Sequence, residues 1–303
     1  MAKNKKRRPR RRKFRPILLL LGLMLAAVAV MSGQIPWEKL GVFPPLNYTP
    51  EPSVQMEIHM IDVGQGESIL VRCGTETMLV DAGLRESGDD VSAYLQAQGI
   101  EKLDRLVISH DHSDHRGGLQ RVLRDIDTNV LMLYDGGDRD SGYLLAGELA
   151  GSSACDIAFL EAGQTFSLGS ATVTVVFPRA GYGSDDLNDV SLVLLLECDG
   201  KRVLLTADST AAAEWLYYED LPQVDVLKVA HHGSGGSTTT ELLQQIKPKL
   251  ALISCGKNND YGHPHKRVLQ DLQHMGAAVY RTDLQGDLVV RLRDGAFSVK
   301  TQR

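Results

Sequence analysis

The chain has 303 residues, of which 43% are hydrophobic and 23% are charged, and this composition is typical of a globular protein with a sizeable core. Its four cysteines are scattered and include no Cys-x-x-Cys pair, which excludes a disulfide framework. Ten of the 33 basic residues fall within residues 1–16, which contain no acidic residue, so the rest of the chain has 23 basic residues against 38 acidic ones, a net charge of −15. An acidic body therefore follows a basic tail.

An uncharged stretch of 20 residues, from Pro16 to Ile35, follows the basic tail and is long enough to cross a hydrocarbon core of ~30 Å as a helix. Basic residues before such a span place the N-terminus in the cytoplasm. We therefore expect residues 1–35 to be a cytoplasmic tail and a transmembrane anchor, which makes the chain a single-pass cell-membrane protein with its body outside. The alternative is a signal peptide cleaved at Ala27-Val28-Ala29, which would release a secreted protein. Both readings export the body.

Residues 36–53 contain five prolines and little periodicity, which predicts an extended stalk. From residue 54 to residue 303, patterns typical of strands and helices follow one another in what we expect to be one domain. The expected strands are Met56–Asp62, Ser68–Arg72, Thr77–Asp81, Leu103–Ser109, Val130–Leu133, Thr172–Phe177, Ser191–Glu197, Arg202–Thr206, Val224–Val229, Ala278–Arg281, Asp287–Arg291 and Phe297–Lys300. The expected helices are Asp89–Gln98, Gly118–Arg124, Thr210–Tyr218, Thr239–Ile246 and His265–Met275. Apolar runs without strict alternation indicate stacked sheets with helices outside.

The strongest chemical signal is the run His110-Asp111-His112-Ser113-Asp114-His115, directly after the predicted strand Leu103–Ser109. Imidazole nitrogens and carboxylate oxygens are ligands that suit Zn²⁺ and Mn²⁺. His110 and His112 alternate, so an extended segment aims both to one side, while Asp114 and His115 come after the chain has turned and can serve a second metal. A surface loop with incidental histidines is the weaker reading, because nine histidines spread over 303 residues seldom place three in one six-residue window.

The pattern His-x-His-x-Asp-His after a buried strand resembles the signature of the metallo-β-lactamase superfamily. Five further runs stand in an order that is similar to the hydrolase domain of the ComEC competence (DNA-uptake) protein family: Ile61–Ser68, Asn188–Ser191, Leu205–Asp208, Leu227–Ser234 and Tyr261–His265. The resemblance covers about residues 54–303. It implies an α/β fold, the four-layered αββα sandwich of that superfamily, and two divalent metal ions, Zn²⁺ or Mn²⁺.

The resemblance implies that His110 and His112 bind the first metal. The usual middle histidine of the superfamily is missing, and the run Asn188-Asp189-Val190-Ser191 occupies that part of the chain. A weaker ligand from Asn188 or Ser191, or a water, would take its place, and both side chains would lie where substrate binds. Glu67 stands where the ComEC pattern more often has Asp, and we expect it near the rim of the site.

For the second metal, the resemblance implies Asp114 and His115 as ligands. Asp208 would bridge both metals through its carboxylate, and His231 would complete the second site. A bridging carboxylate, in place of the cysteine of the lactamases proper, fits the phosphoesterase branches of the superfamily. Asp81 would orient a metal-bound histidine from behind.

Two further histidines and two carboxylates receive roles in catalysis or substrate binding. Asp114 or Asp208 would orient the attacking water. His232 either donates to a phosphoryl oxygen or makes a structural hydrogen bond. His263 precedes Pro264 at a predicted helix start, so it either contacts the substrate or caps the helix.

The resulting expectation is an exported phosphodiesterase that acts on a phosphodiester polymer, with DNA favoured by the resemblance. The acidic body argues partly against a nuclease, because nucleases usually present basic patches to phosphates. Five basic residues near the motifs would offer a local basic rim: Arg116, Lys228, Lys257, Lys266 and Arg267. The alternatives are a phosphodiesterase of teichoic acid or phosphocholine, a non-catalytic wall- or DNA-binding module, and a hydrolase of non-phosphate esters such as a lactonase.

Overall fold

The computed structural model describes residues 53–134 and 155–303. The predicted tail and anchor, and all but the last residue of the predicted stalk, lie outside the described residues. Within the described ranges, no helix has both the length and the apolar character needed to cross a membrane. Pro45–Arg303 forms one compact unit, whose described part is treated below.

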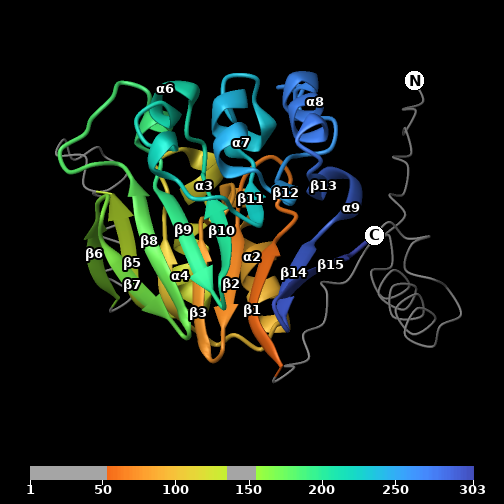
Figure 1. Cartoon of the computed structure of the whole chain (residues 1–303). Coiled ribbons are helices and arrows are strands. Elements are labelled where there is room, and N and C mark those ends of the chain that lie inside the picture. Colours follow the sequence, from red (N-terminus) through yellow and green to blue (C-terminus); the bar gives the residue numbers. More distant parts are fainter. Residues whose placement is uncertain (1–52, 135–154) are drawn as a thin grey trace, which may run out of the picture. The chain divides into compact units, whose positions relative to one another are not determined.

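The first of two mixed sheets contains eight strands in the order β15-β14-β1-β2-β3-β4-β5-β6 (Figure 1). Its first five strands in chain order are β1 Val54–Met60, β2 Ile69–Cys73, β3 Glu76–Val80, β4 Lys102–Val107 and β5 Asp127–Tyr134. The others are β6 Asp156–Leu160, β14 Leu288–Arg293 and β15 Ala296–Thr301. Strands β3 to β6 run parallel, whereas β1, β2, β14 and β15 pair antiparallel.

The second sheet contains seven strands in the order β13-β12-β11-β10-β9-β8-β7. The strands are β7 Thr165–Leu168, β8 Ala171–Phe177, β9 Val193–Cys198, β10 Lys201–Leu205, β11 Val226–Lys228, β12 Leu250–Ile253 and β13 Ala278–Arg281. Strands β10 to β13 are parallel, and β7 to β10 are antiparallel. Each sheet is therefore half parallel, and most of the expected site residues follow strands of the parallel halves, whereas Asn188 and Ser191 precede the antiparallel strand β9.

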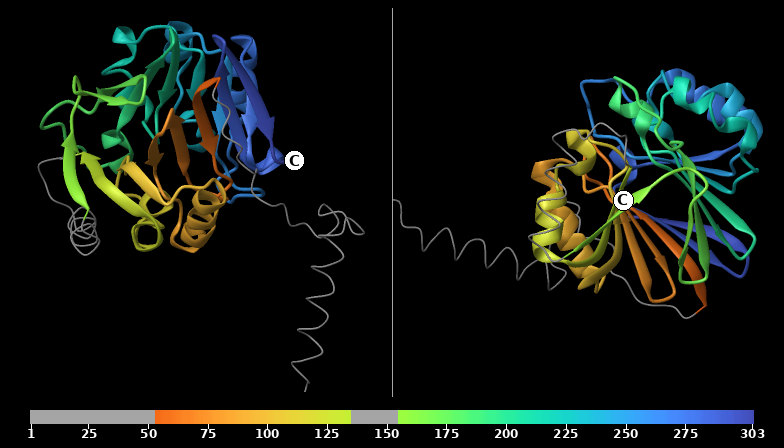
Figure 2. Two further views of the ribbon diagram at one scale, coloured as in Figure 1. Left: turned by 90° about the horizontal axis from the view of Figure 1, so that it is seen from below. Right: turned by 90° about the vertical axis from the view of Figure 1, so that its left-hand side faces the viewer.

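The two sheets face each other, and helices lie against their outer faces (Figure 2). The buried faces of α2 Gly88–Ala97 and α4 Leu119–Asp125 pack on the first sheet, and those of α7 Thr240–Ile246 and α8 Lys266–His274 pack on the second. A third apolar cluster fills the space between the sheets. Each helix stripe and each sheet face is thereby removed from water, which is the main favourable term in folding.

Shorter segments complete the unit. Among the described residues they are three short helices, α3 Ser113–Arg116, α6 Ala211–Glu214 and α9 Thr282–Gln285, and four 3-10 turns, Arg85–Ser87, Leu187–Val190, Tyr218–Asp220 and Ala230–Gly233. The helix expected over Thr210–Tyr218 ends at Glu214, because the chain tightens there into turns that lead to Tyr218–Asp220.

The α/β class and the two stacked sheets were expected from the sequence, and the structure confirms both. Strands β6, β7 and β12 were not predicted. β6 and β7 lie at sheet edges, where several side chains are exposed and the apolar run is short. β12 consists of four apolar residues, and a short apolar run cannot be distinguished from a buried helix segment by periodicity alone.

Candidate metal centre

Most of the expected site residues follow the C-terminal ends of parallel strands. Asp81 comes one residue after β3, and His110 comes three residues after β4. In the other sheet, Asp208 follows β10 and His232 follows β11. Because β3 pairs parallel with β4, and β10 with β11, these strand ends meet at one edge of each sheet. That edge is where ligands bind in open α/β sheets.

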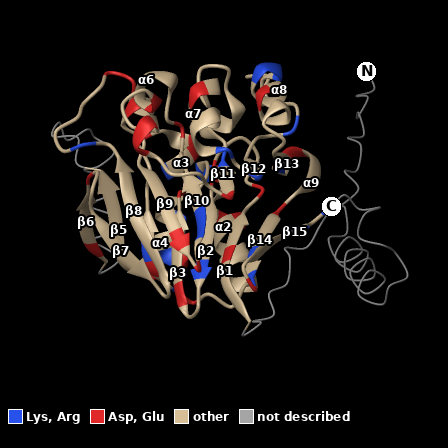
Figure 3. Ribbon diagram, viewed as in Figure 1, with Lys and Arg blue, Asp and Glu red and all other residues tan. Residues whose placement is uncertain are grey.

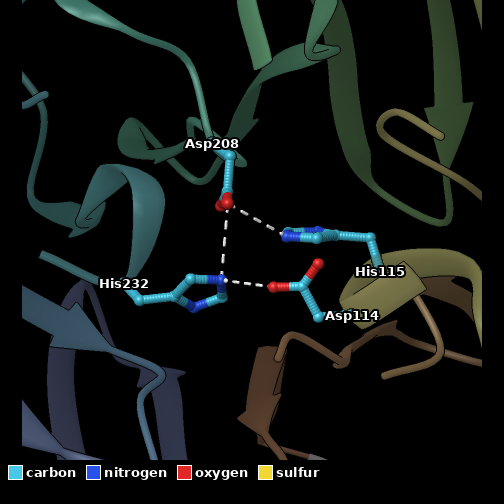
Figure 4. Close-up of side chains that lie close together, drawn as sticks. All are labelled: Asp114, His115, Asp208 and His232. Atoms are coloured by element: carbon cyan, nitrogen blue, oxygen red, sulfur yellow. Dashed lines mark ion pairs between the residues drawn. The ribbon is translucent and has the colours of Figure 1, made fainter. Parts of the chain in front are cut away.

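Four side chains from the two halves of the unit converge on one point (Figure 4). Their ligand atoms all lie within 4.8 Å of one another: Asp114, His115, Asp208 and His232. Asp208 Oδ2 is 3.2 Å from His115 Nε2 and 3.4 Å from His232 Nε2, and His232 Nε2 is 3.3 Å from Asp114 Oδ2. One carboxylate oxygen thus lies between two imidazoles, which is the arrangement expected of a shared ligand.

The Nδ1 atom of each imidazole in this cluster has a hydrogen-bond partner that fixes the ring. Asp81 Oδ2 is 2.7 Å from His115 Nδ1, and the same carboxylate accepts hydrogen bonds from the backbone N–H and the hydroxyl of Ser109. His232 Nδ1 donates to the carbonyl oxygen of Ser254 at 2.9 Å, since a carbonyl can only accept. Both rings therefore present Nε2 to Asp208, as metal-binding histidines do when a second partner fixes the tautomer.

The carboxylates of the cluster are stabilised by positive charge at its centre. Burial by itself raises the pKa of Asp208, but the neighbouring His232 and His115 outweigh it and hold that pKa well below its usual value. Burial lowers the pKa of His232, yet Asp208 and Asp114 raise it to about 9. The pKa of His115 is raised in the same way by Asp208 and Asp81. The carboxylates are thus compensated by protons that a divalent cation would replace.

Buried atoms without hydrogen-bond partners also indicate that these residues fit a divalent metal. His115 Nε2, His232 Nε2 and Asp208 Oδ1 are buried and make no hydrogen bond of good geometry within the described part of the chain. Buried polar atoms are normally satisfied, so three of them around one point indicate a missing electrophilic partner. Nitrogen and oxygen donors of this kind suit Zn²⁺ or Mn²⁺.

A second group of predicted residues lies beside this cluster. His110 Nε2 is 3.1 Å from His112 Nδ1, which in turn is 3.0 Å from Asn188 Oδ1. The ring of His110 is 4.2 Å from that of His115, so the two groups are neighbours. Ser191 is buried, and its Oγ has no hydrogen-bond partner among the described residues. The run Asn188–Ser191, in which the usual histidine is missing, therefore places Asn188 in contact with His112.

The two adjacent histidines differ from the sequence expectation. His231 was expected as a ligand, but its Nε2 is 3.7 Å from Asp208 Oδ2, and its side chain is 29% exposed. His232 is 1% exposed and belongs to the cluster instead. Both residues have left-handed backbone conformations, with φ of 50° and 54°, so they do not follow the alternation of a strand on which the expectation rested.

Such a conformation costs a non-glycine residue roughly 1–2 kcal/mol. Asp81 and Ala207, the latter next to Asp208, also have positive φ values, of 62° and 44°. Residues held in sparsely populated conformations concentrate at functional sites, where the surrounding structure maintains them. Here they turn the chain sharply at the strand ends, which brings side chains of both sheets to one point.

His263, expected at the substrate or at a helix cap, lies at the rim of the cluster. Its ring centroid is 5.7 Å from that of His231 and 6.3 Å from that of His232. Burial and the neighbouring histidines lower its pKa to about 4, so its ring is neutral near pH 7. It does not cap α8, whose first residue is Lys266.

Sequence reasoning missed a buried ion pair behind Asp208. Lys228 was expected on a basic rim and Glu67 near the rim, but both are fully buried and contact each other. Lys228 Nζ also lies 3.6 Å from Asp208 Oδ1 and donates to the carbonyl oxygen of Ala207 at 2.6 Å. The sequence did contain a signal, because Lys228 interrupts the apolar residues 226–230, and a buried charge must be paired.

Comparisons with known proteins agree with this geometry. A model of the metallo-beta-lactamase superfamily matches residues 61–257. The chain is 35% identical over 272 residues to ComE operon protein 3 of Bacillus subtilis (strain 168). This match covers 82% of this chain and 34% of that protein. It is 31% identical over 301 residues to competence protein ComA of Neisseria gonorrhoeae. That match covers 95% of this chain and 40% of the relative. The chain thus spans well under half the length of these relatives.

Among solved structures, CmlA, a diiron beta-hydroxylase from Streptomyces venezuelae, superimposes with a TM-score of 0.56 over 80% of this chain and 55% of that one. The sequences are 19% identical, so this likeness concerns the fold alone. The two competence relatives confirm the resemblance to the ComEC family that the motifs predicted. Because the superfamily model spans most of the chain, this protein belongs to the metallo-beta-lactamase superfamily.

Proposed function

We propose that this protein is a metal-dependent phosphodiesterase that cleaves a DNA strand outside the cell. The observation that carries the proposal is the position of Asp208 Oδ2 between His115 Nε2 and His232 Nε2, with Asp114 Oδ2 close to the same His232 nitrogen. This donor set would hold two divalent ions together with His110 and His112. Such ions supply Lewis acidity that polarises a phosphoryl oxygen and lowers the pKa of water.

The chain's own residues position the reacting groups. Asp208 and Asp114 offer carboxylate oxygens that accept a hydrogen bond from the attacking water and orient it. Asp81 fixes the ring of His115, and the Ser254 carbonyl fixes that of His232, so neither imidazole reorients during turnover. Asn188 and Ser191 would line the substrate side of His112, because Asn188 contacts that ring directly. Preorganised groups of this kind are the main source of transition-state stabilisation in polar reactions.

Two observations favour DNA over other phosphodiesters. One relative of this chain is named a competence protein, and the order of the motifs in this sequence is similar to that of the ComEC hydrolase domain. Basic side chains are also present at the start of α8, where Lys266 and Arg267 lie, whereas acidic ones gather near α6 (Figure 3). The rim next to His263 is therefore less acidic than the body as a whole, and it would receive the strand.

Metal analysis and a substrate panel test the proposal. The purified full-length chain, reconstituted with Zn²⁺ or Mn²⁺, is expected to bind up to two equivalents of metal and to cleave single-stranded DNA and bis-p-nitrophenyl phosphate. Less than half an equivalent of bound metal would contradict the metal centre.

The same panel separates the alternatives. Cleavage of poly(glycerol phosphate) or of phosphocholine esters without cleavage of DNA would point to a wall phosphodiesterase. Full metal occupancy without turnover of any ester would point to a binding module on this scaffold.

A further inference from the structure

Three aromatic rings form a series from the buried cluster to the protein surface. The rings of His232 and His263 are 6.3 Å apart with an interplanar angle of 25°, and those of His263 and Tyr261 are 5.5 Å apart at 22°. His232 is 1% exposed and Tyr261 is 66% exposed, the highest value among the large hydrophobic side chains of the described residues. The planes are thus nearly parallel, and the outermost ring presents a face to solvent.

The loop that carries Tyr261 is built to hold this arrangement. Asn259 Nδ2 donates to the carbonyl oxygens of Gly256 and His263, at 2.9 and 2.7 Å, while its Oδ1 accepts from the N–H of His263 at 2.9 Å. Gly256 N in turn donates to Gln65 Oε1 at 3.1 Å, which connects this loop to the loop between β1 and β2. A platform fixed in advance loses little conformational entropy when a ligand stacks on it.

Single exposed aromatic residues are common and need no ligand to explain them. Tyr261 differs from the others in its alignment. Trp215, the next most exposed aromatic residue in residues 53–134 and 155–303, meets Tyr218 edge to face at 89°, and none of its ring contacts within those ranges is with the cluster. The face of Tyr261 instead continues a series of rings that begins at a cluster residue, so a planar ligand there would be oriented with respect to the candidate metal centre.

We propose that Tyr261 and His263 form a stacking site for a nucleobase of the strand whose phosphodiester lies at the Asp208 cluster. This inference rests on the proposed function and narrows it, because a poly(glycerol phosphate) chain has no planar group to stack. Stacking on an aromatic side chain is independent of base identity, so the site takes single-stranded DNA without sequence preference. Exposed Lys257 and Lys266 flank the loop in sequence and would meet the backbone phosphates.

A quaternary ammonium such as choline is the other ligand that an exposed tyrosine face attracts. Recognition of that kind uses cages in which several rings surround the cation. At Tyr261 the neighbouring ring lies parallel and on the inner side, which leaves one open face. The geometry therefore favours a flat base over a spherical cation.

Binding of fluorescent oligonucleotides to the full-length chain in the presence of a chelator tests the site without turnover. The probes are an oligothymidylate and an abasic strand of equal length, and the variants are Tyr261→Ala and Tyr261→Phe. Phe159→Ala serves as the matched control, since Phe159 is 47% exposed on the edge strand β6. Melting temperatures confirm that each variant is folded.

Tyr261→Ala is expected to weaken binding of the oligothymidylate about tenfold, equivalent to about 1.4 kcal/mol, and to leave the abasic strand unaffected. Tyr261→Phe and Phe159→Ala should bind like the parent chain. Equal binding of both strands by the parent chain, or no effect of Tyr261→Ala, would overturn the stacking site even where DNA is still cleaved. Competition by phosphocholine that depends on Tyr261 would overturn it in favour of a cation site.

Binding and cleavage together distinguish a failure of the stacking site from a failure of the proposed function. Tyr261-dependent binding without cleavage in any divalent metal would support the stacking site and refute the phosphodiesterase. Failure of the metal-loaded chain both to bind and to cleave DNA would refute both.

Discussion

At the scale of single residues, the site depends on which atoms are brought to Asp208. The run His110–His115 supplies two members of the Asp208 cluster, Asp114 and His115, because metal ligands after a strand end leave closely spaced His and Asp residues in the sequence. The choice between His231 and His232 was beyond sequence reasoning. It is set by two consecutive left-handed residues, which no spacing rule anticipates.

The assignment of the two histidines leads to a direct prediction. His232→Ala should lower the bound metal of the reconstituted chain by at least half, because it removes a buried nitrogen of the cluster. His231→Ala should retain more metal than His232→Ala, since His231 lies at the partly exposed edge of the cluster. Elemental analysis of both variants, with His274→Ala as a control on α8, decides the matter. The reverse order would return the ligand role to His231.

The buried pair behind Asp208 gives a second prediction. Lys228→Met leaves Glu67 and one oxygen of Asp208 without their buried cation, and breaking such a pair typically costs 3–5 kcal/mol. The free energy of unfolding in urea with a chelator present should fall by about that amount. Adding Glu67→Gln to Lys228→Met should recover part of the loss, because the unpaired carboxylate is then neutral. A double variant no more stable than Lys228→Met would show that the pair is not coupled.

At the scale of elements, α6 supports the turn that carries the cluster histidines. Glu214 accepts hydrogen bonds from the backbone N–H groups of Thr238 and Thr239, at 2.6 and 2.8 Å. Thr238 Oγ1 accepts in turn from the N–H of Ala230, which begins the histidine turn. A carboxylate on a helix of four residues thus connects the second sheet's outer layer to the site.

This connection predicts a pH dependence. Burial raises the pKa of Glu214 from 4.5 to about 7, although the N–H donors of Thr239 and Thr238 act in the opposite direction. Between these two values the folded state holds a proton that the unfolded state has released, so the stability contributed by Glu214 falls as the pH rises, by at most about 3 kcal/mol. Glu214→Gln cannot ionise. Its free energy of unfolding relative to the parent chain should therefore increase from pH 4.5 to pH 8, and a constant difference would contradict the raised pKa.

Elements were predictable where packing on both sides leaves an apolar run in the sequence. Strand β9 is of this kind, because its residues 193–196 are all apolar and buried. Edge strands β6 and β7 expose part of their surface, so their sequences lack that signal. The short α3 was read as a turn, because four residues cannot show helical periodicity.

At the scale of the whole molecule, charge is segregated between the basic residues 1–16 and the acidic remainder. An acidic body repels a polyanion over long distances, so a DNA strand would be held by local contacts at the rim rather than by the overall field. The affinity for single-stranded DNA should consequently show a shallow dependence on salt. The affinity should be measured between 50 and 200 mM salt. Over this range, proteins with 6–10 phosphate contacts lose ~10³-fold or more in affinity. A loss of that size here would show that the rim carries an extended basic surface and would contradict the prediction.

The position of the body relative to the membrane is the last prediction, and it rests on the order of the N-terminal segments. Ten basic residues before an uncharged stretch of 20 should retain the N-terminus in the cytoplasm and place residues 54–303 outside. Protease added to intact cells is expected to remove the body while a cytoplasmic control protein survives. A body that resists protease until the cells are lysed would refute the export, and a mature protein in the medium that begins near Val30 would replace the anchor with a cleaved signal peptide. Replacing six of the basic residues by glutamate should lower the fraction of body that protease reaches, because the charge difference across the stretch sets its orientation.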